Sequence, residues 1–93
     1  MAQSNGARKV LIVDGDSATR RDIRSACAQD GYQVLEAENG AEALREVGSA
    51  RPSLVLLEVA LPDGSGFDVC RELRKADAAR RVAETCIAVA QMR

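Results

Sequence analysis

The chain has 93 residues, and its 13 basic and 14 acidic side chains give a formal net charge of −1. This length allows one small domain, and the balanced charge gives no electrostatic reason to expect a nucleic acid or an anionic membrane as a partner. Hydrophobic residues make up 46% of the chain, too many for a disordered protein. No apolar run approaches the roughly 18 residues that a membrane span needs. We expect a cytoplasmic globular domain at residues 8–93 after a flexible segment at residues 1–7.

The residue types that the chain lacks narrow its chemistry. It contains no histidine, which excludes Ser-His and Cys-His nucleophiles. Cys27, Cys70 and Cys86 lie too far apart for a CxxC metal pair or a disulfide framework. We expect all three to be small, reduced core residues.

Short apolar runs alternate with helical patterns along the chain. Residues 10–13 form a fully apolar run that ends in turn residues, which predicts a strand buried on both faces. A helix follows, with Ser17 suited to its N-cap, Arg20 facing water and Asp30-Gly31 at its end. The later predicted elements are a strand at 32–36, a helix between Asn39-Gly40 and Gly48-Ser49, a strand at 54–57, a loop at 61–66, a helix from Phe67 and a weak strand at 86–90. Residues 75–83 fit a helix or a loop.

Acidic residues follow two of the predicted strands. Asp14 comes after the first strand, Asp16 lies two residues later, and Glu58 follows the third strand. The alternation of strands and helices predicts a parallel sheet with helices on both faces, and sites in such sheets form beyond the carboxyl ends of the strands. If the two strands are neighbours, about 4.8 Å apart, Asp14 and Glu58 converge on one edge. There they would raise a pKa or recruit a hard cation, or they would serve only as solvated turn residues.

Four runs of the sequence resemble the receiver domain of bacterial response regulators. They are VLIVDGDS, GYQVLEAENGAEAL, PSLVLLEVALPDGSGFDVCRELR and IAVA, which together span about residues 8–91. The most specific pieces are the acidic turn after the first strand, the helix start at Asn39-Gly40, and Leu61-Pro62 followed by Gly66. The resemblance implies an α/β, flavodoxin-like, doubly wound sheet in the strand order 2-1-3-4. It also implies a role in two-component signalling, with a histidine kinase or an output domain as the protein partner.

The same resemblance implies a phosphorylation site at the carboxyl edge of the sheet. In the family, an Asp after the third strand accepts a phosphoryl group beside Mg²⁺, which a second acidic residue after the first strand and a backbone carbonyl help to hold. A hydroxyl after the fourth strand and a Lys after the fifth bind the phosphoryl oxygens. In this sequence the matching positions hold Glu58 for the acceptor, Gly15 for the second acid, Ala60 for the carbonyl, and Ala90 (or Gln91 with a one-residue gap) for the hydroxyl. A Mg²⁺ site built from Asp14, Asp16, Glu58 and Ala60 is therefore expected to be weak or absent, and the Lys has no counterpart.

These departures predict a degenerate receiver domain. Phosphoryl transfer depends mostly on positioning and charge neutralisation, and Glu carries its carboxylate about 1.5 Å further out than Asp. We expect a non-enzymatic module that works by protein–protein contact without phosphotransfer. Three alternatives stay open: an active acceptor that uses Glu58 with Mg²⁺, a Glu58 that imitates the phosphorylated state, and a structural or oligomerising fragment.

Two further features have open interpretations. Gly15 either provides a positive φ in its turn or marks a metal-ligand position under relaxed selection. The family fold continues beyond the fourth strand with a further helix, strand and helix. We therefore expect either a piece of a longer chain or a homo-oligomer formed through the open edge of the fourth strand.

Overall fold

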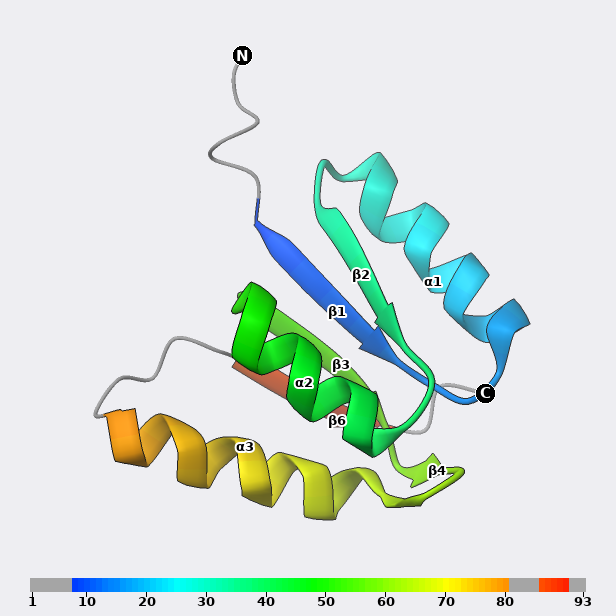
Figure 1. The fold of residues 1–93 in the computed structure, drawn as a ribbon. Coiled ribbons are helices and arrows are strands. Elements are labelled where there is room, and N and C mark those ends of the chain that lie inside the picture. The colour runs from blue at the N-terminus through cyan, green and yellow to red at the C-terminus, as the bar shows by residue number, and fades with distance from the viewer. Residues whose placement is uncertain (1–7, 81–85, 91–93) are drawn as a thin grey trace.

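The computed structural model describes residues 8–80 and 86–90 (Figure 1). The expected flexible segment at residues 1–7 and the candidate Gln91 lie outside the described residues. The elements, in chain order, are β1 (Lys9–Val13), α1 (Ser17–Gln29), β2 (Gln33–Ala37), α2 (Gly40–Ala50), β3 (Leu54–Glu58), β4 (Ala60–Leu61), β5 (Gly64–Ser65), α3 (Gly66–Arg80) and β6 (Cys86–Ala90).

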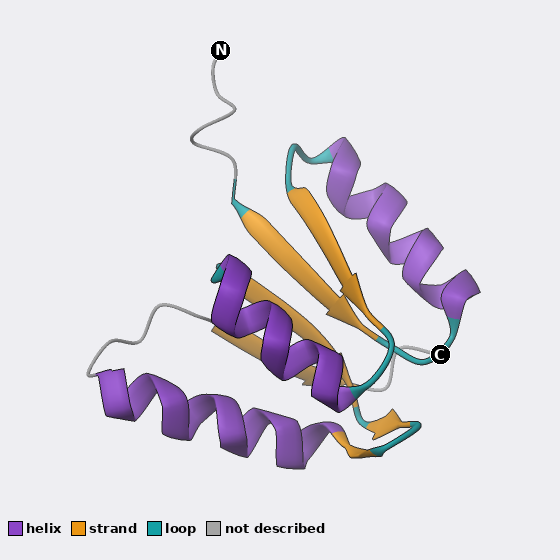
Figure 2. Ribbon diagram, in the orientation of Figure 1, coloured by secondary structure: helices purple, strands orange, loops and turns teal. Residues whose placement is uncertain are grey.

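The four longer strands form one parallel sheet in the spatial order β2-β1-β3-β6 (Figure 2). Because β6 is the fourth of these strands along the chain, the predicted order 2-1-3-4 is confirmed. In the register, Val13 pairs with Ala37 on one side and with Leu57 on the other. The carboxyl ends of β1, β2 and β3 therefore meet at the same edge, while β6 forms one side edge of the described sheet.

Helices cover both faces of the sheet, as the doubly wound prediction requires. α2 and α3 pack on one face, and α1 lies on the other, over β1 and β2 (Figure 1). The core on the first face consists of Leu11, Val13, Ala37, Val55, Leu57 and Leu61 from the strands, Ala43 and Val47 from α2, and Val69 and Leu73 from α3. α1 contributes no buried residue, so the core is concentrated between the sheet and the α2–α3 layer. Within the described ranges, no helix has the length and apolar character needed to cross a bilayer.

The start of α1 differs from the prediction by one residue. Asp16, not Ser17, is the N-cap, and its side chain accepts a hydrogen bond from the backbone N of Thr19 at 3.0 Å. Both residue types are good caps. The carboxylate at position 16 takes this role because its backbone is extended, with φ −95° and ψ 115°, whereas Ser17 already belongs to the helix.

The end of α2 also lies further along the chain than predicted. Gly48 and Ser49 were expected to close the helix, but α2 continues to Ala50. Arg51 ends it in the left-handed conformation, with φ 51°, and its backbone N donates to the carbonyl of Val47. A glycine inside a helix lowers its stability without ending it, so Gly48 alone was a weak stop signal.

The predicted loop at residues 61–66 contains regular structure. β4 and β5 pair as a short antiparallel hairpin, with Ala60 opposite Ser65 and Leu61 opposite Gly64. α3 then begins at Gly66 and runs to Arg80, so the ambiguous segment 75–83 is helical as far as it is described. Two-residue strands are too short to produce a detectable hydrophobic period, which explains why no sequence pattern predicted the hairpin.

Candidate functional site at the carboxyl edge of the sheet

Two acidic side chains are buried where β1 and β3 end. Asp14 is fully buried, and Glu58 is 2% exposed. They follow the paired residues Val13 and Leu57 on neighbouring strands, so the prediction that they converge on one edge is confirmed. A buried acidic side chain requires hydrogen-bonding partners to offset its desolvation, and these partners determine what the site can do.

Asp14 is bound to the start of α1. Its Oδ1 accepts a hydrogen bond from the backbone N of Asp16 at 2.9 Å, and its own backbone N donates to the carbonyl of Ala37 at 3.1 Å. The Asp14 carbonyl accepts a hydrogen bond from Nη1 of Arg20 at 2.6 Å. Asp14 therefore fixes the turn between β1 and α1 through both its side chain and its backbone.

Asp16 and Glu58 also have local partners. Oδ2 of Asp16 accepts hydrogen bonds from the backbone N and the hydroxyl of Thr19. Oε2 of Glu58 lies 3.4 Å from the backbone N of Ala60, at the long end of hydrogen-bonding distance. Across residues 8–80 and 86–90, no three His, Cys, Asp or Glu side chains form a group that could hold a metal ion. The structure therefore does not bring Asp14, Asp16 and Glu58 together as one set of ligands.

The ring of Pro62, and not the backbone conformation of Gly15, leaves no room for a larger side chain at position 15. Among the described glycines only Gly31 and Gly64 have a positive φ, so the interpretation that Gly15 needs a positive φ is wrong. A Cβ added at Gly15 would lie 2.8 Å from Cγ and 3.0 Å from Cδ of Pro62. Pro62 thus occupies the space that a side chain at the second acidic position would need. With Gly15 crowded in this way and Asp16 bound to its helix, the residues present do not fit the Mg²⁺ site that the resemblance implies.

The remaining two candidate residues, Ala60 and Ala90, are both close to Glu58. Ala60 follows it in the chain and begins β4, and Ala90 pairs with it across β3 and β6. The Ala90 carbonyl accepts a hydrogen bond from the backbone N of Val59 at 3.2 Å. Neither side chain has a polar atom, so they offer only backbone groups to an incoming anion.

Arg20 belongs to this edge of the sheet, contrary to the prediction from the sequence. It was expected to face water, but its side chain is only 13% exposed. Besides the Asp14 carbonyl, it binds Oε1 of Glu36 through Nε at 2.9 Å. The pKa of Glu36 is lowered, mainly by the hydrogen bond from Arg24 and also by that from Arg20, while burial opposes the shift. Arg20 therefore connects the acidic edge of β1 to β2.

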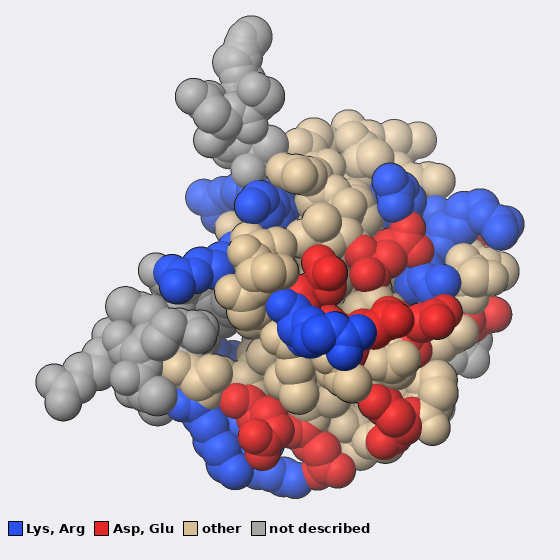
Figure 3. All heavy atoms as spheres, viewed as in Figure 1, with Lys and Arg blue, Asp and Glu red and all other residues tan. Residues whose placement is uncertain are grey.

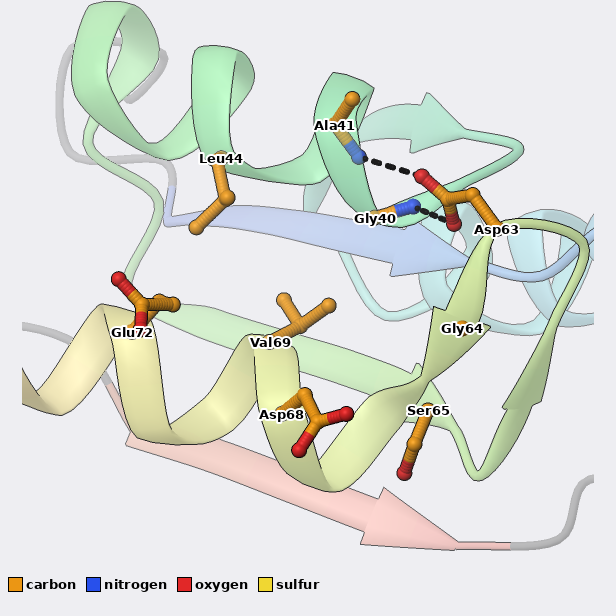
Figure 4. A pocket seen from close by; sticks show the side chains of 9 residues that line it. All are labelled: Gly40, Ala41, Leu44, Asp63, Gly64, Ser65, Asp68, Val69 and Glu72. Atoms are coloured by element: carbon orange, nitrogen blue, oxygen red, sulfur yellow. Dashed lines mark hydrogen bonds between the residues drawn. The ribbon is translucent and has the colours of Figure 1, made fainter.

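Asp63 is a second residue whose role the sequence did not reveal. Its two carboxylate oxygens accept hydrogen bonds from the backbone N of Gly40 at 2.8 Å and of Ala41 at 3.1 Å (Figure 4). The Pro62-Asp63-Gly64 run had indicated only a turn. The side chain instead caps α2 from outside the helix, alongside the N-cap Asn39, whose Oδ1 accepts from the backbone N of Glu42. The first turn of α2 is thereby tied to the hairpin that follows Glu58.

The capping of α2 by the Asp63 carboxylate predicts that the folded domain loses stability in acid. The hydrogen bonds from Gly40 and Ala41 hold the pKa of Asp63 below its ordinary value of 3.8. The unfolded chain therefore binds a proton at Asp63 more readily than the folded one, so the stabilisation is complete above that value and is lost as the pH falls through the lower folded pKa. Urea unfolding of the wild type and of Asp63→Asn between about pH 5 and pH 2 should show a stability gap that closes in acid.

A matched control for this prediction is Asp22→Asn, which removes one negative charge from the exposed surface of α1. It should leave the wild-type pH dependence in place. A gap between the wild type and Asp63→Asn that stays constant across the pH range would contradict the assignment of Asp63 as the cap.

The fold and the site together define a class of protein. A doubly wound parallel sheet with one buried acidic residue after its first strand and another at the end of its third strand has the plan of a receiver domain. The family described as the response regulator receiver domain matches residues 10–91. The chain belongs to this family, whose members act in two-component signalling.

Individual relatives agree with this membership. The chain is 42% identical to the KDP operon transcriptional regulatory protein KdpE of Escherichia coli over 66 residues, and 42% identical to the probable transcriptional regulator ycf27 of Pyropia yezoensis over 71 residues. These alignments cover 71% and 76% of this chain but only 29% of each relative. The chain therefore spans less than a third of the length of these curated relatives.

Solved structures show the same fold. The response regulator TrrA of Thermotoga maritima, in a complex with the histidine kinase ThkA, matches with a TM-score of 0.79 and 30% identity over 90% of this chain and 68% of that chain. The chemotaxis response regulator CheY4 of Vibrio cholerae matches with a TM-score of 0.78 and 26% identity over 89% of this chain and 67% of that chain.

Proposed function

We propose that this receiver domain works without phosphotransfer, through contacts with other proteins such as a histidine kinase or an output domain in the cytoplasm. The observation that carries the proposal is the environment of Glu58. It stands at the position of the phospho-acceptor, is 2% exposed, and turns one carboxylate oxygen toward the backbone N of Ala60. An acceptor must present an oxygen to an incoming phosphoryl group in line with the leaving group, and a buried carboxylate directed at its own turn is poorly placed to do so.

The surroundings of Glu58 support the same conclusion. Receiving a phosphoryl group requires cationic or hydrogen-bonding groups to neutralise its charge. Gly15 offers no carboxylate for a metal ion, and Pro62 crowds the space beside it. Ala90, opposite Glu58 on β6, has no hydroxyl. A misplacement of about 1 Å can slow a reaction on the order of a hundredfold, and here both the acceptor and its supporting groups depart from the pattern that the family's chemistry uses.

Phosphate donors provide the test of this proposal. After incubation with acetyl phosphate and Mg²⁺, intact-mass spectrometry should show no phosphoryl adduct. Beryllofluoride with Mg²⁺ should leave the melting temperature unchanged, which covers the case of an adduct too short-lived for mass measurement. Glu58→Asp should behave as the wild type in both assays, because shortening the side chain does not restore the metal ligand or the hydroxyl.

A phosphoryl adduct on the wild type that disappears in Glu58→Gln would overturn the proposal and favour the active acceptor. An adduct that appears only in Glu58→Asp would show that the length of the Glu58 side chain alone blocks the reaction. It would contradict the proposal that the missing carboxylate at Gly15 and the missing hydroxyl at Ala90 also prevent phosphotransfer. TrrA of Thermotoga maritima, whose structure with Mg²⁺ and a beryllium fluoride group is known, serves as the positive control for the beryllofluoride assay.

A further inference from the structure

A groove of about 280 Å³ lies between α2 and α3, and neither Asp14 nor Glu58 lines it. Leu44 projects from α2 and Val69 from α3 toward the space between the helices (Figure 4). Asp63 lies at the end of the groove where both helices begin, and Glu72 lies further along α3. The centre of the groove is therefore apolar, and its ends carry negative charge.

Among the described residues that line the groove, Leu44 is left partly uncovered. Leu44 is 40% exposed, although the next turn of the same helix buries Val47 in the core. Single exposed hydrophobic residues are common, but an exposed leucine that lines a groove provides an anchoring point for a partner side chain.

The charged side chains that line the groove all have the same sign. Its lining includes three carboxylates, Asp63, Asp68 and Glu72, and no Lys or Arg. Figure 3 shows acidic side chains gathered on this face over α3. Asp68 pairs with Arg71, and Glu72 pairs with Lys75 at 3.1 Å, both within α3 and on exposed side chains. Exposed pairs of this kind contribute little, so a cation from a partner can replace Arg71 and Lys75.

We propose that this groove binds a protein segment that carries an aliphatic side chain flanked by Lys or Arg. The aliphatic side chain would pack on Leu44 and Val69, and the cations would meet Asp68 and Glu72. The volume favours one or two side chains, because pockets that enclose a whole small ligand measure about 300–1,000 Å³. This inference rests on the proposed function, since it names the chemistry of one partner that a contact module would engage.

The test uses a fluorescein-labelled peptide of alternating Leu and Lys blocks that forms an amphipathic helix, with binding to the 93-residue chain read by fluorescence anisotropy. The peptide should bind saturably, and more weakly as salt is raised. Asp68→Asn/Glu72→Gln and Leu44→Lys should each weaken binding on the order of tenfold. These positions are exposed, and circular dichroism verifies that the variants fold.

Matched controls lie on other surfaces. Asp22→Asn/Asp30→Asn removes two exposed carboxylates at α1 and its end, and Tyr32→Lys changes a residue that is 38% exposed, close to the 40% of Leu44. Both should stay within about twofold of the wild type. The inference is overturned if the peptide does not bind saturably, or if the controls weaken binding as much as the groove variants. The assay contains no phosphate donor, so its outcome is independent of the test of phosphotransfer.

Discussion

Substitution of Gly66 by Ala is expected to destabilise the domain by about 3 kcal/mol or more. An added Cβ at Gly66 would lie 2.2 Å from the carbonyl oxygen and 3.0 Å from the carbonyl carbon of Glu58. Neither atom can move away easily, because Glu58 is held in the sheet by its pairing with Ala90 and the Gly66 backbone N donates to the Val59 carbonyl at 2.7 Å. This close approach of two backbone segments admits only a glycine.

Chemical denaturation of Gly66→Ala, compared with Gly48→Ala, provides the measurement. A Cβ at Gly48 has no heavy atom within 4 Å, and the residue is an exposed interior position of α2. Gly48→Ala should therefore stabilise the domain by about 0.5–1 kcal/mol, through higher helix propensity and a less flexible unfolded chain. Equal unfolding midpoints for Gly66→Ala and the wild type would show that the turn after Glu58 is looser than described.

The second large effect is expected at Gly15. Gly15→Ala should lower the free energy of unfolding by about 1–3 kcal/mol, because its Cβ would meet the Pro62 ring at 2.8 Å. A proline ring has little freedom to move aside, and Asp63 beside it is bound to Gly40 and Ala41. An acidic side chain at position 15 would meet the same ring, so restoring the family's metal ligand requires the hairpin to shift.

A double-mutant cycle with Pro62→Ala isolates this contact. In the Pro62→Ala background the ring atoms are gone, so Gly15→Ala should cost less than in the wild type, with a coupling of about 1 kcal/mol or more. Urea unfolding of the four proteins supplies the values. Strict additivity of the two substitutions would refute the contact as the reason for a glycine at position 15.

The sequence predicted the parallel sheet well because its strands are nearly continuous apolar runs. Residues 10–13 and 54–57 leave no polar face, which only a sheet covered on both sides can accommodate. Element ends were harder to predict. Asp16 and Ser17 are adjacent and both suit an N-cap, so the choice between them depends on backbone angles that composition does not encode. Val69 enters the core and Phe67 does not, because Val69 and Leu73 are four residues apart and share the face of α3 that packs in the core.

The site was predictable in position but not in detail. The rule that sites form beyond carboxyl ends placed Asp14 and Glu58 correctly. It could not show where their oxygens point, because that depends on the backbone N atoms of Asp16 and Ala60. Asp63 reaches α2 across a separation of 23 residues, and a single sequence gives no pattern for such a tertiary contact.

The hairpin between β4 and β5 has a consequence for the order of folding. Pro62 packs on Gly15 just before α1, Asp63 binds the first residues of α2, and Gly66 opens α3. One short segment therefore touches the beginnings of three helices that are far apart along the chain. Bringing such distant residues together requires loop closure, which is entropically unfavourable until many contacts form at once. The first turns of α1, α2 and α3 should therefore form together, late in folding and cooperatively, rather than one after another during synthesis of the chain.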